Sequence, residues 1–208
     1  MSLARSERHA LVRTMSEVGP DAPTLCGDWT VRDLAAHLLV RERRVDGMPG
    51  IVVPALAGHT EKLRKQATDR QWAHLLADLD SGPPKWSPFF LVDAVANATE
   101  MFVHHEDVRR ARPGWEPRAL PSSEQDQLWR FARMIARTGY RGCDLTVVFE
   151  RSDTGEQVTV RKRGPRTVVL RGEPAELLLH AFGRDEVRLD VDGEEAWVAE
   201  LNASQRGV

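Results

Sequence analysis

The spacing of hydrophobic positions changes about two thirds of the way along the chain. Up to about residue 140, apolar side chains recur every three or four residues, which is the spacing of one face of an α-helix. From Cys143 onward the spacing falls to two, which is typical of strands with one buried face. The sequence therefore predicts an α+β protein, with a helical domain over residues 1–140 and a small α+β domain over residues 141–208.

Four principal helices with shorter satellites are expected in the first domain, and they predict a four-helix bundle. Thr30 and Asp33 have the spacing of a capping box, as do Thr68 and Gln71, so each pair is expected to begin a helix. The principal helices and satellites together are expected to cover approximately residues 3–18, 30–45, 68–80, 88–112 and 128–139.

The second domain is expected to contain four strands and one helix. Asp153–Gly155 is predicted to be the turn of a hairpin between the first two strands, and Pro174 begins the helix. The expected strands cover residues 145–149, 157–160, 167–171 and 187–191.

One stripe of the expected helix over 88–112 is polar, although the positions on both sides of it are apolar. At roughly 100° per residue, this stripe carries Asp93, Asn97, Glu100, His104 and Asp107. Buried polar groups are costly unless they are paired or bound to a metal, so the stripe indicates a built site. Glu100 and His104 are four residues apart and share a helix face, which fits either a hydrogen-bonded pair or two metal ligands.

The helix that begins at Thr30 offers a third candidate ligand. His37 lies three residues after Leu34, on the apolar side of that helix. A histidine there is either a core residue with a backbone partner or a metal ligand, and the residues alone leave both interpretations open. Cys26 is close to His37 in sequence, and we expect it to be a small buried residue rather than a reactive thiol.

Composition and charge narrow the class of protein. The net charge of -2 gives no overall attraction to nucleic acid or to an anionic membrane, so neither is expected as a partner. The sequence has no run of about 18 apolar residues, and its first residues lack the apolar core of a secretion signal. Cys26 and Cys143 are the only cysteines, which fits a reducing compartment. We therefore expect a cytoplasmic protein.

Several short segments together resemble one known family. They are Leu25–Leu38, Arg41–Arg44, Glu100–His104, Val103–Ala111, Gly172–Leu177 and Gly183–Arg184. The first four resemble the mycothiol-dependent maleylpyruvate isomerase family, a DinB-like group of four-helix proteins, and within it an actinobacterial branch. The last two are similar to the C-terminal domain of that family, which looks like a sterol-carrier-protein fold.

This resemblance implies a metal site. In the family a divalent metal, usually zinc, is held by a histidine of the second helix and a Glu-x-x-x-His pair of the last bundle helix, and these positions match His37, Glu100 and His104. Two histidines and a carboxylate are also the ligands of non-haem iron enzymes, so iron and nickel stay open as minor possibilities. Asp107 would either orient a ligand imidazole or cap an arginine, and for His105 we favour a structural role.

The resemblance also implies a reaction class. It indicates a transferase or isomerase in which the metal activates a small thiol such as mycothiol for attack on a small electrophilic substrate. Two alternatives remain, a non-catalytic metalloprotein and a metal-dependent hydrolase on the same bundle. Neither the electrophile, the catalytic residues nor the oligomeric state follows from the sequence.

Overall fold

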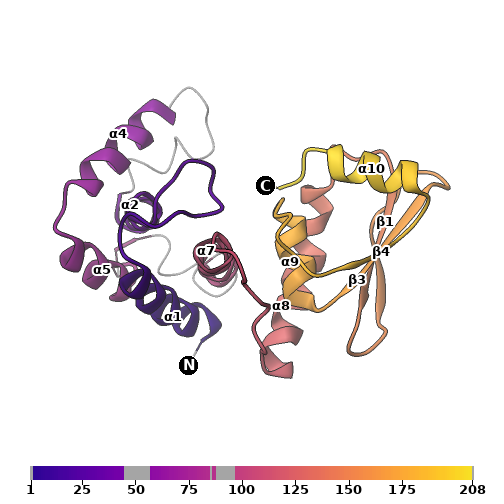
Figure 1. The fold of residues 1–208 in the computed structure, drawn as a ribbon, viewed down its shortest axis with the longest axis horizontal. Coiled ribbons are helices and arrows are strands. Elements are labelled where there is room, and N and C mark those ends of the chain that lie inside the picture. Colours follow the sequence, from indigo (N-terminus) through magenta and orange to yellow (C-terminus); the bar gives the residue numbers. More distant parts are fainter. Residues whose placement is uncertain (1, 45–56, 85, 88–96, 208) are drawn as a thin grey trace. The chain divides into compact units, whose positions relative to one another are not determined.

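The computed structural model describes residues 2–44, 57–84, 86–87 and 97–207. The chain divides into two compact units, Met1–Trp115 and Glu116–Val208. The described ranges contain eight helices and one four-stranded sheet, which confirms the predicted α+β class (Figure 1). None of the described helices is both long and apolar enough to cross a bilayer.

The first unit is a bundle of amphipathic helices. Helix α1 packs against α5 and α7, and α2 packs against α4 and α5 (Figure 1). Their apolar faces meet in a core to which α1, α2, α5 and α7 all contribute, and residues such as Leu11, Leu34, Leu75 and Met101 are fully buried there. The helices are α1 (Leu3–Val18), α2 (Val31–Arg43), α4 (Ala57–Thr68), α5 (Trp72–Asp80) and α7 (Ala98–Arg110).

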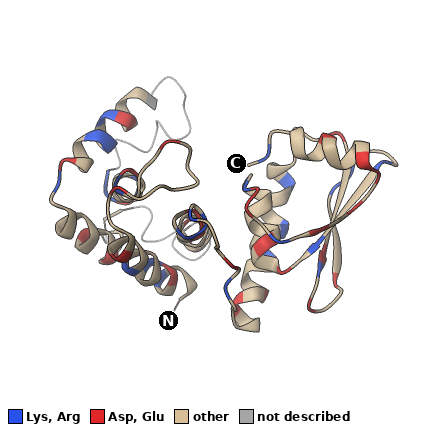
Figure 2. Cartoon of the chain, viewed as in Figure 1, with Lys and Arg blue, Asp and Glu red and all other residues tan. Residues whose placement is uncertain are grey.

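A buried ion pair adds a directional contact to this core. The Arg8 guanidinium of α1 donates to both carboxylate oxygens of Glu42 in α2, at 2.7 and 2.5 Å, and also to the carbonyl of Leu79. A bidentate pair of this kind fixes the relative position of the helices as well as their contact. Elsewhere, residues of both charge signs are distributed over the helices of each unit (Figure 2).

Two expectations for the first unit need correction or restriction. The capping box expected at Thr68 and Gln71 is wrong, because Thr68 is the last residue of an additional helix, α4, and its hydroxyl donates to the carbonyl of Lys65. Gln71 is instead the N-cap of α5 and makes no side-chain capping bond. The expected helix over 88–112 is described only from residue 97, so its first part and Asp93 lie outside the described residues.

The second unit is a small sheet with helices packed on it. The strand order is β2-β1-β3-β4, in which β1 pairs antiparallel with β2 and parallel with β3. Helices α8 and α9 pack against each other (Figure 1). Helix α8 also contacts β2, and α9 contacts β3. The elements are α8 (Ser122–Gly139), β1 (Thr146–Arg151), β2 (Gln157–Arg161), β3 (Thr167–Gly172), α9 (Pro174–Ala181), β4 (Asp190–Asp192) and α10 (Glu195–Ala203).

The structure differs from the expected second domain in three respects. Helix α8 belongs to the second unit, whereas the expected boundary at residue 140 placed it in the bundle, because its apolar side packs against α9. The last strand is shorter than expected and covers only Asp190–Asp192. Helix α10 was not expected. The hairpin is as predicted, with Gly155 at a φ of 72° and its N–H donating to the carbonyl of Arg151.

Candidate metal centre

Helix α2 positions His37 through a well-defined start. Thr30 is the N-cap, and it forms the predicted capping box with Asp33, in which each side chain bonds the backbone N–H of the other. His37 lies one turn after Asp33. Its ring packs against that of Trp29 at a centroid distance of 5.1 Å, and its side chain is 21% exposed.

Helix α7 brings Glu100 and His104 to the same place. His104 Nε2 lies 3.2 Å from Glu100 Oε1, and His37 Nε2 lies 4.0 Å from the same oxygen. The rings of His37 and His104 are 5.9 Å apart and nearly perpendicular. One ligand atom from each of the three residues lies within 4.8 Å of the others. The structure therefore gathers the three residues that the sequence singled out.

The remaining described members of the polar stripe support these side chains. Asp107 is fully buried, and its Oδ2 accepts a hydrogen bond of 2.9 Å from His104 Nδ1. Of the two roles expected for Asp107, this geometry favours orientation of the imidazole. Asn97 accepts a bond of 2.7 Å from Arg41, whose Nε lies 3.7 Å from Glu100 Oε1. The guanidinium of Arg41 therefore lies beside the carboxylate of Glu100.

The electrostatics of the group prepare two of the three side chains for a cation. Burial, together with the charges of His104 and Arg41, lowers the pKa of His37 to about 4, so this imidazole is neutral at pH 7. For Glu100, burial opposes ionisation, but the bond and charge of His104 and the charge of Arg41 outweigh it and lower the pKa to about 2.

His104 differs from His37 and Glu100, because its pKa is shifted in the direction that opposes cation binding. Burial lowers its pKa, but the hydrogen bonds with Asp107, Cys26 and Glu100 outweigh burial and hold the pKa well above 6.5. The protonated ring then donates from Nδ1 to Asp107 and from Nε2 to Glu100. The proton on Nε2 must leave if this nitrogen is to bind an ion.

Cys26 also takes part in this group, which the sequence does not predict. Its thiol is partly exposed, donates to Asp107 Oδ2 at 3.2 Å and lies 3.7 Å from His104 Nδ1. The expectation of a plain buried residue is therefore wrong. The only signal in the sequence was its position eleven residues before His37, and that signal does not reveal a contact with α7.

His105 takes the structural role expected of it. It is buried between α1 and α7, with Nδ1 3.0 Å from the carboxylate of Glu7 and Nε2 3.0 Å from the hydroxyl of Thr14. Both ring nitrogens are thus engaged by α1, and the ring lies on a different side of α7 from its neighbour His104.

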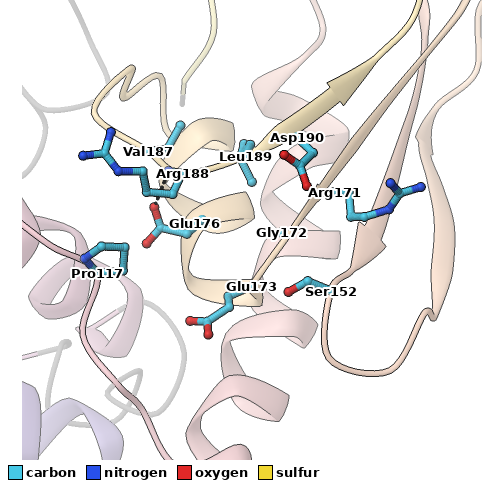
Figure 3. A pocket seen from close by; sticks show the side chains of 10 residues that line it. All are labelled: Pro117, Ser152, Arg171, Gly172, Glu173, Glu176, Val187, Arg188, Leu189 and Asp190. Carbon is cyan, nitrogen blue, oxygen red and sulfur yellow. Dashed lines mark hydrogen bonds between the residues drawn. The ribbon is translucent and has the colours of Figure 1, made fainter.

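The second unit contains an open cavity of about 570 Å³ at the ends of β1 and β3 (Figure 3). Three of its charged residues, Glu173, Glu176 and Arg171, have partners in the protein. Glu176 accepts the backbone N–H of Arg188 at 2.8 Å, and Glu173 accepts from Gln125. Arg171 is paired with Glu150 outside the cavity. The candidate metal-ligand groups found among the described residues both lie in the first unit, so the chemistry is better placed there.

Comparisons with known proteins give one family. A family model described as the mycothiol maleylpyruvate isomerase N-terminal domain matches residues 2–137. A crystal structure of the mycothiol-dependent maleylpyruvate isomerase is similar, with a TM-score of 0.64 and 16% identity, covering 92% of this chain and 91% of that one. The structure of a histidine-to-alanine mutant of the same enzyme is also similar, with a TM-score of 0.62, 17% identity and the same coverage of both chains. No curated protein matches the sequence.

Proposed function

Since the chain belongs to the family of the mycothiol maleylpyruvate isomerase N-terminal domain, we propose that it is a metal- and thiol-dependent isomerase or transferase acting on a small electrophile. The proposed centre is one divalent ion, for which zinc fits best, held by His37, Glu100 and His104. The observation that carries this proposal is the approach of these three side chains, from two helices, to within 4.8 Å of one another.

The donor chemistry fits a catalytic rather than a closed structural site. Two imidazole nitrogens and one carboxylate form a common ligand set of catalytic zinc, in which a further position stays open for water or substrate. Glu100 is ionised and His37 is neutral at pH 7, as metal binding requires. Their side chains are 24% and 21% exposed, so a small molecule has access to them.

The residues around the centre hold these ligands in place. Asp107 fixes the ring of His104 through Nδ1 and leaves Nε2 directed at Glu100. The ring of Trp29 packs against the ring of His37 at a centroid distance of 5.1 Å. A divalent ion bound here would lower the pKa of a thiol or a water molecule at its open position. Arg41 adds a positive charge beside the centre, which favours an anionic nucleophile or substrate.

The names of the similar solved enzymes suggest which thiol is used. Both structures are described as mycothiol-dependent, and we propose mycothiol as the co-substrate here on that basis. The two reaction classes differ in a measurable way. An isomerase returns the thiol unchanged after each turnover, whereas a transferase consumes one thiol for each electrophile, so the thiol balance distinguishes them.

The metal centre is tested by the metal content of purified protein and its variants. We expect about one divalent ion per chain in the wild type, and loss of tight binding in His37→Ala, Glu100→Gln and His104→Ala, because each removes one of three ligands. His74→Ala is the matched control, since His74 is an exposed histidine on α5. Full occupancy in His104→Ala, or a wild type without stoichiometric metal, would show that the assignment is wrong.

A further inference from the structure

Cys26 lies in the loop between α1 and α2, and that loop is fixed to both the candidate centre and α7. The N–H of Leu25 donates to the backbone carbonyl of Asp107 at 3.1 Å. The N–H of Cys26 donates to the hydroxyl of Thr24, and the N–H of Trp29 donates to the carbonyl of Cys26. The thiol is therefore held at a defined position next to α7.

Both the thiol and the imidazole use the same acceptor atom. Cys26 Sγ donates to Asp107 Oδ2 at 3.2 Å, and His104 Nδ1 donates to that oxygen at 2.9 Å. Asp107 is fully buried, so its carboxylate takes its hydrogen bonds from donors within the protein. A chain of contacts runs from Cys26 through Asp107 to His104, whose other nitrogen faces Glu100.

From this geometry we propose that Cys26 is a positioning residue of the metal centre, acting on His104 through Asp107. The inference rests on the proposed function, because it assigns a role relative to the ion at His37, Glu100 and His104. The thiol restricts the orientation of the Asp107 carboxylate, and the carboxylate sets the direction of His104 Nε2. Hydrogen bonds to the ligands of a metal commonly contribute 10–100-fold to its affinity.

The same atoms have a competing interpretation as a second ion site. Cys26 Sγ, His104 Nδ1 and an oxygen of Asp107 lie within 4.8 Å of one another, so an ion could bind among them. An ion among these atoms would break both hydrogen bonds that Asp107 Oδ2 accepts, from Cys26 Sγ and from His104 Nδ1. An ion at His37, Glu100 and His104 Nε2 leaves both bonds in place, and we therefore assign Cys26 to positioning.

The experiment compares Cys26→Ala, Cys26→Ser and the matched control Cys143→Ala, which removes the other thiol from the second unit. Zinc affinity and the visible absorption spectrum of the cobalt(II)-substituted protein are measured for each. Cys26→Ala should bind one ion about 10–100-fold more weakly and shift the cobalt spectrum, because the ring of His104 is less well oriented. Cys26→Ser should restore most of both, since a hydroxyl also donates to Asp107. Cys143→Ala should match the wild type.

A double-mutant cycle tests the route through Asp107. If Cys26 acts on His104 only through that carboxylate, Cys26→Ala should have little further effect on zinc affinity in an Asp107→Asn background. Fully additive effects would contradict the route. Cys26→Ala with wild-type affinity and an unchanged cobalt spectrum would overturn the positioning role while leaving the proposed function intact.

Two further outcomes are distinguishable. A second bound ion that is lost in Cys26→Ala, or a sulfur-to-cobalt charge-transfer band that disappears in both Cys26 variants, would make Cys26 a ligand and overturn the proposal.

The His104 Nδ1 proton provides a readout that needs no ion. In metal-free protein its NMR signal should be protected from exchange in the wild type and Cys26→Ser but not in Cys26→Ala. If that pattern holds and the wild type binds no ion, the proposed function fails and the hydrogen-bond chain stands.

Discussion

At the scale of single residues, His180 is a buried histidine whose two ring nitrogens are both engaged. Arg206 can only donate, so Nε2 of His180 accepts from it, and Nδ1 carries the proton and donates to the hydroxyl of Tyr140. A second proton would place a cation beside the Arg206 guanidinium. Burial, together with this charge, lowers the pKa of His180 to about 3.

This pKa predicts a loss of stability in acid. The unfolded chain titrates at His180 near pH 6.5 and the folded chain near 3, so between these values the unfolded state binds more protons. The free energy of unfolding should therefore fall as the pH drops from about 6.5 toward 3, by on the order of 4 kcal/mol for this group. Urea titrations of the wild type and His180→Gln over this range measure the difference. Parallel pH dependence in the two proteins would contradict the prediction.

The candidate ligands could be found from sequence because helix periodicity is a local property. Glu100 and His104 share a face by their spacing of four residues, and His37 follows a recognisable capping box. The contribution of Cys26 could not be found in this way. It depends on how the loop before α2 meets α7 some 80 residues later, which is a tertiary contact with no periodic signature.

At the scale of elements, the start of α2 determines where His37 lies. Thr30→Ala should destabilise the first unit by about 1 kcal/mol, because it removes one half of the capping box. It should also weaken zinc binding, since the first turns of α2 carry the ligand. Thr68→Ala is a suitable control, because Thr68 ends α4 and caps no helix start. Thermal melts and zinc titrations of both variants make the test. Equal effects of the two substitutions would argue against a specific role of the capping box in positioning His37.

Two of the departures from the expected elements arise where a local sequence signal fits more than one structure. The spacing of Thr68 and Gln71 predicts a helix start, but a threonine can also end a helix with its hydroxyl bonded to a carbonyl of the preceding turn. The sequence predicts α8 as a helix, but it does not predict that α8 packs against α9. Its periodic apolar face is compatible with any neighbour, and only the fold shows that the neighbour is α9.

At the scale of the whole molecule, the two compact units predict where the chain can be divided. The family match extends to residue 137, inside α8, whereas the first unit ends at Trp115. A fragment of residues 1–115 should be folded and bind zinc as the full chain does, because all three candidate ligands and their supporting residues lie within it. A fragment of residues 1–140 should be prone to aggregation, because it exposes the face of α8 that packs on α9.

Size-exclusion chromatography and zinc analysis of the two fragments test this division. A soluble, metal-binding fragment 1–140 together with an insoluble fragment 1–115 would show that α8 is needed by the bundle. It would also support the domain boundary after residue 140 that the sequence predicts.

In the proposed function, one metal ion and one thiol act together on the substrate. The most direct measurement is the turnover of a panel of small electrophiles in four parallel reactions, with and without zinc and with and without mycothiol. We predict turnover only when both are present, and its loss in Glu100→Gln with wild-type folding. Equal rates with and without the thiol would contradict the claim and indicate a metal-dependent hydrolase. No turnover at full metal occupancy would contradict it in favour of a non-catalytic metalloprotein.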